Sequence, residues 1–193
     1  MSTLGFVNGN EKTIHNLLAA YQGEMNTQAR YKKFAARADE EGLLGIASLF
    51  RATARSEQIH ANNQARAIRQ LGGEATAQIE PMNVRSTLEN LKTALSGENF
   101  EINTVYPAFI EEARAHINAT AARSFDWALE AERTHARLYT EAIALMDGTH
   151  SNSWVGEARD FYVCPVCAAT TEHKNSENCA ICNYPSERLE AIR

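Results

Sequence analysis

Two copies of a Glu-x-x-His motif constrain this chain more than any other feature of its sequence. They are Glu57-Gln58-Ile59-His60 and Glu132-Arg133-Thr134-His135, and each lies in a long run of helix-favouring residues. Residues three apart share one face of an α-helix and stand about 4.5 Å apart along its axis. Each motif therefore presents a carboxylate and an imidazole in the same direction. Two such helices, with one Glu from each of two others, supply the ligands of a di-iron carboxylate site in a four-helix bundle.

The hydrophobic pattern predicts that both motifs lie on long helices. Apolar residues recur at helical spacing along four stretches, from Ile14 to Ala35, Leu43 to Leu71, Val84 to Glu112 and Ile117 to Met146. Residues 73–83 show no clear period and are long enough to cross one end of a bundle. Pro107 is expected to bend the third helix or to remove one of its backbone hydrogen bonds. The sequence therefore predicts an all-α fold, a four-helix bundle with one long crossover connection.

Five glutamates fall on these apolar stripes, where side chains are expected to be buried: Glu24, Glu57, Glu98, Glu101 and Glu132. A buried carboxylate without a partner costs several kcal/mol even after relaxation, so five that point into one core require cations. Oxygen and imidazole ligands suit iron or manganese, and carboxylates can bridge two ions. Two divalent or two trivalent ions nearly balance five negative charges, so such a site can hold either oxidation state.

The alternative interpretation is that the Glu-x-x-His motifs occur by chance and face water. One copy would leave that alternative open. The second copy, together with single glutamates on the matching stripes of the other helices, argues against it. Tyr31 and Tyr106 lie about two turns or less from these positions. Tyrosines so placed usually belong to the core, but either can hydrogen-bond a ligand carboxylate.

All four cysteines lie near the end of the chain, as Cys164-Pro165-Val166-Cys167 and Cys179-Ala180-Ile181-Cys182. Four thiolates in two short loops form a tetrahedral site for iron or zinc, and the spacing alone also allows a zinc ribbon. A module this small buries little apolar surface and needs the metal to fold. The pattern predicts a bundle domain over 1–148, a linker over 149–160 and a metal-binding domain over 161–193.

Composition and charge exclude several classes of partner. The formal net charge is −5 and no basic tract occurs, which argues against nucleic acid. No run of 18 apolar residues is present, so no membrane span is expected. Residues 1–7 carry no basic segment followed by a long apolar run, which predicts no secretory signal and a cytoplasmic location. In that setting paired cysteines indicate metal thiolates rather than disulfides.

Together these residues resemble the rubrerythrin family over nearly the whole chain. The resemblance rests on the single Glu24, the two Glu-x-x-His motifs, the stretch from Gly97 to Pro107 and the double Cys-x-x-Cys. Glu101 is its specific mark, because ferritin-type sites generally lack this fifth carboxylate. The resemblance implies a ferritin-like bundle that holds two iron ions. It also implies a C-terminal rubredoxin-like module that holds one iron, although zinc remains possible there.

The resemblance also implies a role for each residue of the di-iron site. Glu57 and Glu132 would bridge the two irons, and Glu98 and His135 would hold one of them. Glu24 would be a terminal ligand of the other, mobile iron.

Catalytic roles follow from the same resemblance. The mobile iron would be held by Glu101 when oxidised and would shift toward His60 when reduced. Tyr31 and Tyr106 would hydrogen-bond near the site.

The cysteine module departs from the rubredoxin pattern at two positions. Rubredoxin loops usually place Gly just after the second cysteine of each pair, and here Ala168 and Asn183 stand there. Asn tolerates a positive φ, whereas Ala does so poorly. The intervening loop is also short. We therefore expect an altered redox potential or metal rather than the loss of the site formed by Cys164, Cys167, Cys179 and Cys182.

The function implied is a non-haem di-iron peroxidase that reduces hydrogen peroxide to water. Electrons would arrive one at a time through the cysteine site from a rubredoxin or an NAD(P)H-dependent reductase. A homodimer, head-to-tail or swapped through the linker, is expected. Two alternatives stay open, an iron-handling ferroxidase and a non-enzymatic redox sensor or metal scaffold with zinc on the cysteines.

Overall fold

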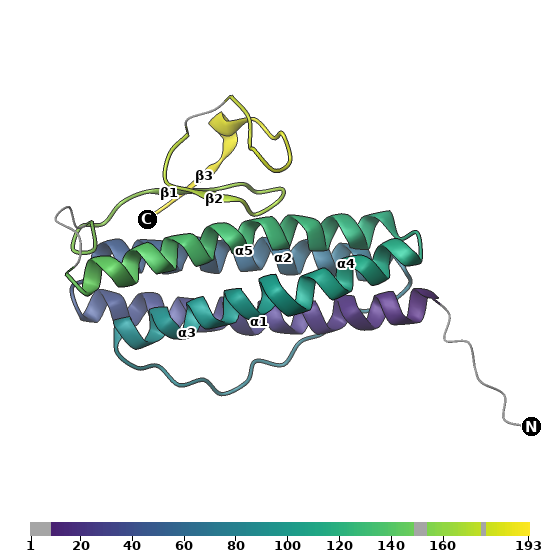
Figure 1. The fold of residues 1–193 in the computed structure, drawn as a ribbon, viewed down its shortest axis with the longest axis horizontal. Helices are drawn as coiled ribbons and strands as arrows, with labels where there is room; N and C mark the ends of the chain where they lie inside the picture. The colour runs from purple at the N-terminus through teal and green to yellow at the C-terminus, as the bar shows by residue number, and fades with distance from the viewer. Residues whose placement is uncertain (1–8, 149–153, 175–176) are drawn as a thin grey trace, which may run out of the picture.

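The computed structural model describes residues 9–148, 154–174 and 177–193 of the chain, and the helices form an elongated bundle (Figure 1). Its first two long rods are α1 (Gly9–Glu40) and α2 (Leu44–Gln70). The third rod is composite: α3 (Thr87–Phe100), the π-helical turn η1 (Glu101–Val105) and α4 (Tyr106–Ala115) follow one another in line. The fourth is α5 (Ala119–Met146). The predicted ferritin-like bundle is confirmed, with residues 71–86 as its long crossover connection.

The C-terminal module is a small sheet that lies over α2 and α5 (Figure 1). Its strands are β1 (Phe161–Val163), β2 (Thr170–Thr171) and β3 (Glu190–Ile192), and η2 (Ser186–Arg188) is a short 3₁₀ turn. The order is β2-β1-β3 and both pairings are antiparallel. Val163 of β1 faces Thr170 of β2. The two cysteine loops follow β1 and precede β3, so the sheet holds both ends of the four-cysteine segment.

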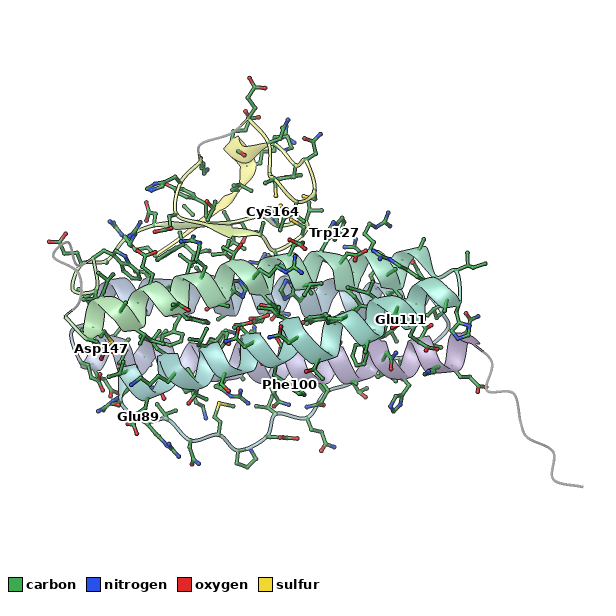
Figure 2. The ribbon with its side chains drawn as sticks, viewed as in Figure 1. Glu89, Phe100, Glu111, Trp127, Asp147 and Cys164 are labelled. Carbon is green, nitrogen blue, oxygen red and sulfur yellow. The ribbon has the colours of Figure 1, made fainter. Side chains whose placement is uncertain are left out.

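The core of the bundle consists of two apolar clusters, whose side chains fill the space between the helices (Figure 2). One cluster contains an aromatic group in which Phe50 contacts Tyr31, Phe34 and Tyr139, with ring centroids 5.4–5.8 Å apart. The other is built on Leu17, Ile68, Ile110, Phe125 and their neighbours. Aromatic pairs at these distances are favourable beyond their buried area.

The crossover connection is tied to α1 by side-chain hydrogen bonds rather than by a core of its own. Gln22 donates to the backbone of Gln78 and accepts from it, and Asn26 accepts from the backbone N–H of Glu80. At its end, Ser86 and Glu89 form a capping box that starts α3. The predicted absence of regular structure over residues 73–83 is confirmed. Side chains of α1 bond to individual backbone groups there, in place of a helix or a sheet.

The third helix departs from an α-helix just before Pro107. The N–H of Tyr106 bonds to the carbonyl of Glu101, a five-residue spacing, and Pro107 follows near the start of α4. A proline lacks the N–H that an α-helix needs in its interior, but none is needed in the first turn. The expected disturbance is therefore present as a π-helical turn that restarts the helix. Such turns often lie at functional sites.

Two apolar residues expected on the buried stripes are exposed, and that prediction was wrong. Val84 precedes α3 and Ile117 precedes α5, with exposed fractions of 40% and 92%. Ile117 ends α4 with a φ of 56°, and the N–H of Asn118 bonds to the carbonyl of Ala113. This is a C-terminal capping turn that glycine normally fills. The apolar spacing in the sequence continues across such a turn. The helix does not, because the chain changes direction there.

Part of the predicted linker packs on the bundle. The N–H of Gly45 bonds to the carbonyl of Val155, and the indole of Trp154 donates to Glu141. A side chain at Gly45 would overlap the carbonyl of Trp154. Residues 149–153 of the predicted linker lie outside the described residues. No helix in the described ranges is long and apolar enough to cross a membrane.

Replacing Ile117 by glycine is expected to raise the free energy of unfolding by about 0.5–1 kcal/mol, because a β-branched residue is strained at positive φ and glycine is not. The matched control is Ala115→Gly, an exposed position still inside α4, which is expected to lower stability by a similar amount. Chemical denaturation of the metal-loaded protein measures both. Equal destabilisation by the two variants would contradict the strain.

Candidate metal centres

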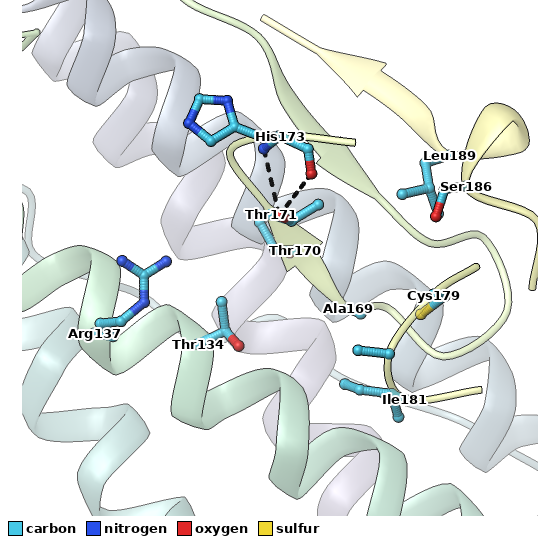
Figure 3. Close-up of a pocket in the computed structure, with 11 residues that line it drawn as sticks. Thr134, Arg137, Ala169, Thr170, Thr171, His173, Cys179, Ile181, Ser186 and Leu189 are labelled. Carbon is cyan, nitrogen blue, oxygen red and sulfur yellow. Dashed lines mark hydrogen bonds between the residues drawn. The ribbon is translucent and has the colours of Figure 1, made fainter. Parts of the chain in front are cut away.

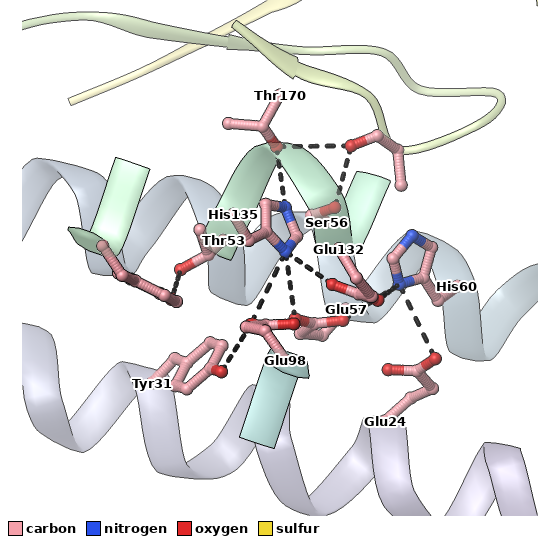
Figure 4. A network of polar contacts seen from close by, with 12 residues as sticks. Glu24, Tyr31, Thr53, Ser56, Glu57, His60, Glu98, Glu132, His135 and Thr170 are labelled. Carbon is pink, nitrogen blue, oxygen red and sulfur yellow. Dashed lines mark hydrogen bonds and ion pairs between the residues drawn. The ribbon is translucent and has the colours of Figure 1, made fainter. Parts of the chain in front are cut away.

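Six side chains from four helices converge at the middle of the bundle (Figure 4). α1 carries Glu24, α2 carries Glu57 and His60, α3 carries Glu98, and α5 carries Glu132 and His135; none is more than 1% exposed. Their ligand atoms form two groups of four, and the members of each group lie within 4.8 Å of one another. One group is Glu24, Glu57, His60 and Glu132; the other is Glu57, Glu98, Glu132 and His135.

Each histidine turns the same ring nitrogen toward the carboxylates. Nδ1 of His60 lies 2.9 Å from Glu57 and 3.0 Å from Glu132. Nδ1 of His135 lies 2.7 Å from Glu132 and 3.6 Å from Glu57. The two rings are 6.3 Å apart between centroids. Both carboxylates of the Glu-x-x-His motifs therefore stand between the histidines, where each can serve two ions.

Several atoms of this cluster have no hydrogen-bond partner among the described residues, and this tests whether a metal fits. They include one oxygen of each of Glu24, Glu57, Glu98 and Glu132. A buried polar atom left unpaired costs about 1–3 kcal/mol, and more when it is charged. Carboxylate oxygens and imidazole nitrogens that face one another in this way are a donor set suited to two divalent or trivalent iron ions.

Burial and mutual repulsion shift the pKa values of the clustered carboxylates. Burial raises the pKa of Glu57 well above its usual value, and repulsion by Glu132 and Glu24 adds to the effect. Burial likewise raises the pKa of Glu132, with repulsion by Glu98 next. For Glu24, burial is the largest single effect, but the attraction of His60 and the hydrogen bonds to Glu24 together outweigh it and lower the pKa. The raised pKa values favour protons on the carboxylates between the two histidines, and a bound cation would displace those protons.

Two buried tyrosines each hold one of the single glutamates. Tyr31 donates to Glu98 at 2.6 Å and Tyr106 donates to Glu24. Burial and the neighbouring carboxylates raise the pKa of both phenols, so they remain hydrogen-bond donors. The predicted hydrogen bonds of Tyr31 and Tyr106 to ligand-type carboxylates are thus present in the structure.

Gln64 is a site residue that the sequence reasoning missed. Its amide donates to Glu24 at 3.0 Å and to the hydroxyl of Tyr106 at 3.3 Å. It follows His60 by four residues on α2 and is fully buried. That spacing placed it on the same helix face as the motif. A buried amide on a metal-facing stripe was the signal that could have identified it.

Glu101 is the predicted ligand that the structure does not bring into either group of four. It opens the π-helical turn η1 and is partly exposed. Burial, and then repulsion by Glu24 and Glu132, raises the pKa of its carboxyl well above its usual value. It lines a surface cavity of about 390 Å³ together with Tyr31, Gly97 and Gly23. Glu101 therefore stands between the carboxylate cluster and solvent.

The four cysteines converge in the C-terminal module. Their sulfurs all lie within 4.8 Å of one another, and the Cys164–Cys182 and Cys167–Cys179 pairs are each 3.5 Å apart. Disulfide sulfurs are about 2.05 Å apart, so these are free thiols. Four metal–sulfur bonds of about 2.3 Å in a tetrahedron put the sulfurs about 3.8 Å apart. The arrangement fits a four-thiolate metal site.

Both cysteine loops form the tight turn after their second cysteine, although neither has the usual glycine there. The N–H of Ala168 bonds to the carbonyl of Cys164, and the N–H of Asn183 bonds to that of Cys179, both at 2.9 Å. Ala168 has a φ of 69° and Asn183 a φ of 63°. Both non-glycine residues therefore adopt the left-handed conformation that glycine usually supplies.

The cysteine module rests on the bundle beside the carboxylate cluster. Ser56 and Asn63 of α2 donate to the carbonyls of Ala168 and Val166, each at 2.8 Å. On the α5 side a cavity of about 320 Å³ separates the two parts, and both Thr134 and Cys179 line it (Figure 3). The two candidate centres thus lie on either side of the same helix layer.

Comparison with known proteins agrees with this geometry. A sequence model of the Rubrerythrin family matches residues 15–143. The chain belongs to the rubrerythrin family. It is 33% identical over 184 residues to Rubrerythrin-2 of Clostridium acetobutylicum, which covers 95% of this chain and 98% of that protein. It is also 33% identical to nigerythrin of Nitratidesulfovibrio vulgaris, over 93% of this chain and 86% of that protein.

Solved structures extend the likeness to three dimensions. The mixed-valence state of nigerythrin superposes with a TM-score of 0.81 at 32% identity, over 93% of this chain and 86% of that one. A bacterioferritin of Desulfovibrio desulfuricans, 23% identical over 77% of this chain and 84% of that one, has a TM-score of 0.68 and shares the fold. In a rubrerythrin the carboxylate–histidine cluster is a di-iron carboxylate site. The four-cysteine cluster is consistent with a rubredoxin-like iron site.

Metal binding at the carboxylate cluster is expected to release protons and to weaken as the pH falls. The pKa values of Glu57 and Glu132 are raised, so the metal-free protein holds protons there above the usual titration range near pH 4.3, and the metal must displace them. Anaerobic Fe²⁺ titrations of protein with zinc on its cysteines, at about pH 6 and about pH 7.5 in two buffers, measure both effects. A pH-independent affinity without proton release would contradict the expectation.

Proposed function

We propose that this rubrerythrin is a peroxidase that reduces hydrogen peroxide to two waters, with two electrons and two protons consumed per turnover. The observation that carries the proposal is the pair of buried ligand groups that share Glu57 and Glu132. Two metal ions held this close can act on the two oxygens of one small substrate. The four-cysteine site in the same chain supports repeated reduction of that pair rather than a single oxidation.

The proposed ligand set divides the cluster into two halves. Glu57 and Glu132 are the shared carboxylates, and Glu98 and His135 complete one half. Glu24 and His60 complete the other, with Glu101 as the alternative ligand to His60. Glu101 stands beside the cluster and outside both groups of four, which supports an exchange in which it becomes a ligand only in one oxidation state.

The iron ions, when bound, supply the two electrons that cleave the O–O bond. The chain itself holds the carboxylates in place through Tyr31 and Tyr106, and Tyr31 also packs against Phe50 of the aromatic cluster. The Glu101 carboxyl, whose pKa is raised by burial, is available as a proton donor at the cavity wall. The remaining proton comes from solvent through the same opening.

The cavity beside Glu101 is the proposed route for peroxide. It lies between α1 and α3, and glycine occupies one position on each helix, Gly23 and Gly97. A Cβ built at either glycine meets no atom within 4 Å, so both positions border open space. Gly97 weakens α3 by about 1 kcal/mol relative to alanine, which a structural role alone does not explain. A glycine here is explained if it keeps a path open by which a small substrate reaches the metal ligands.

The proposed source of electrons is the site formed by Cys164, Cys167, Cys179 and Cys182, supplied by a rubredoxin or an NAD(P)H-dependent reductase. The contact of the module with its own bundle supports transfer within one chain. A head-to-tail or swapped homodimer and a cytoplasmic location remain predictions. Light scattering of the purified protein tests the dimer.

The deciding experiment starts from anaerobically reduced protein mixed with either hydrogen peroxide or oxygen. We expect the visible bands of a ferric thiolate centre and of an oxidised di-iron centre to rise rapidly with peroxide and slowly with oxygen. Faster oxidation by oxygen, with iron leaving the protein, would favour the ferroxidase alternative. A di-iron band without a thiolate band would place zinc on the cysteines and remove the internal electron source.

Substituting Gly97 by leucine is expected to slow the peroxide reaction several-fold, because the side chain extends into the proposed route. Gly97→Ala is the matched control. It is expected to leave the rate unchanged and to stabilise the protein by about 0.5–1 kcal/mol. Stopped-flow rates against peroxide concentration distinguish slower entry from slower chemistry, since only entry changes the second-order constant alone. Identical rate constants for the leucine and alanine variants would exclude this route.

A further inference from the structure

One side chain of the cysteine module, that of Thr170, contacts a residue of the carboxylate site. The hydroxyl of Thr170 lies 3.2 Å from Nε2 of His135, and the two side chains are buried (Figure 4). Thr170 is the first residue of β2 and follows Cys167 by three positions. It therefore directly follows the first cysteine loop, although its side chain contacts His135 of the carboxylate site.

The partners of Thr170 favour one direction for this hydrogen bond. Its hydroxyl is 3.3 Å from the carbonyl of Ala168, which accepts only, so the hydroxyl proton is donated there. The hydroxyl oxygen is then the acceptor for the N–H at Nε2 of His135. With its proton on Nε2, the ring presents the unprotonated Nδ1 to the carboxylates. A ligand histidine needs this tautomer.

The bundle also holds the carbonyl of Ala168, which accepts the hydrogen bond from the Thr170 hydroxyl. Ser56 of α2 donates to the same carbonyl of Ala168 at 2.8 Å. The neighbouring Arg55 pairs with Glu190 of β3 through two contacts of 2.6 and 2.9 Å. Val163 of β1 pairs with Thr170 in the sheet. The position of Thr170 is therefore set both by its own module and by the helix that carries the first Glu-x-x-His motif.

The second histidine lacks such a support. Nε2 of His60 is buried and has no hydrogen-bond partner among the described residues. Its Nδ1 meets the carboxylates much as that of His135 does. The two halves of the cluster thus match in how Nδ1 of each histidine meets the carboxylates. They differ in whether Nε2 of the histidine has a hydrogen-bond partner. A histidine without a partner on its outer nitrogen is free to turn or withdraw.

We propose that Thr170 is a positioning residue of the metal centre, which holds His135 from the cysteine module and makes its half of the site the tighter and more fixed one. This inference rests on the proposed function, because it takes His135 to be a metal ligand. It assigns the mobile half to His60 for a physical reason, the missing outer partner. It also couples the two centres, since a disordered cysteine loop removes Thr170 from His135.

The test uses Co²⁺ titration of the full-length protein with zinc already bound to its cysteines. Wild type is expected to bind two ions in two steps, and His135→Ala is expected to remove the tighter one. Thr170→Val keeps the shape of the side chain but loses the hydroxyl. It is expected to weaken the tighter step by about 10- to 100-fold and to leave the weaker step unchanged. Thr170→Ser restores the hydroxyl and is expected to restore the affinity.

The matched control is Thr140→Val on the same helix as His135, where the hydroxyl donates to the carbonyl of Ala136. It is expected to bind both ions as wild type does. A second readout is the imidazole N–H signal of His135 in protein loaded with Zn²⁺ at both centres. The signal is expected to exchange slowly in wild type and Thr170→Ser, and rapidly in Thr170→Val.

The outcomes separate this inference from the function on which it rests. Failure of wild type to bind two ions at the carboxylate cluster would contradict the proposed ligand set itself. With two ions bound by wild type, an unchanged Thr170→Val variant would overturn the positioning role of Thr170. So would equal weakening of both steps, or a serine variant as weak as the valine variant, because either would indicate general loosening of the module.

Discussion

The repulsion among four buried carboxylates is the constraint on which this molecule depends. Glu24, Glu57, Glu98 and Glu132 meet in the middle of the bundle with almost no exposed surface. Removing such charges from water costs several kcal/mol each unless opposite charge is supplied. The long helices and the apolar clusters on both sides of the site hold the carboxylates together, and the bound cations make that arrangement favourable.

The small cysteine module depends on the bundle in a different way. Its sheet buries few side chains, so its position is fixed by metal thiolates on the inside and by polar contacts with α2 on the outside. Ser56, Asn63 and Arg55 supply those contacts. Because Ser56 and Arg55 immediately precede Glu57, the segment that presents a ligand also anchors the module. The two centres therefore share a structural support and not only a chain.

Sequence reasoning succeeded where the relevant geometry is local. The helical period alone put Glu57 with His60, and Glu132 with His135, on common faces, and the apolar stripes around them predicted burial. It failed at helix ends, as at Ile117, because a capping turn changes the direction of the chain without changing the pattern of side chains. It also missed Gln64, whose role depends on Glu24 and Tyr106 of other helices.

The sequence by itself determined the ligand chemistry: which carboxylates, imidazoles and thiols are available, and which of them share a helix face or a loop. It could do so because those relations span only a few residues. Only the tertiary structure decided that Glu57 and Glu132 belong to both groups, that Glu101 stands at the cavity, and that Thr170 supports His135. Thr170 and His135 are 35 positions apart, and their contact depends on how the cysteine module docks, which no local pattern of side chains encodes.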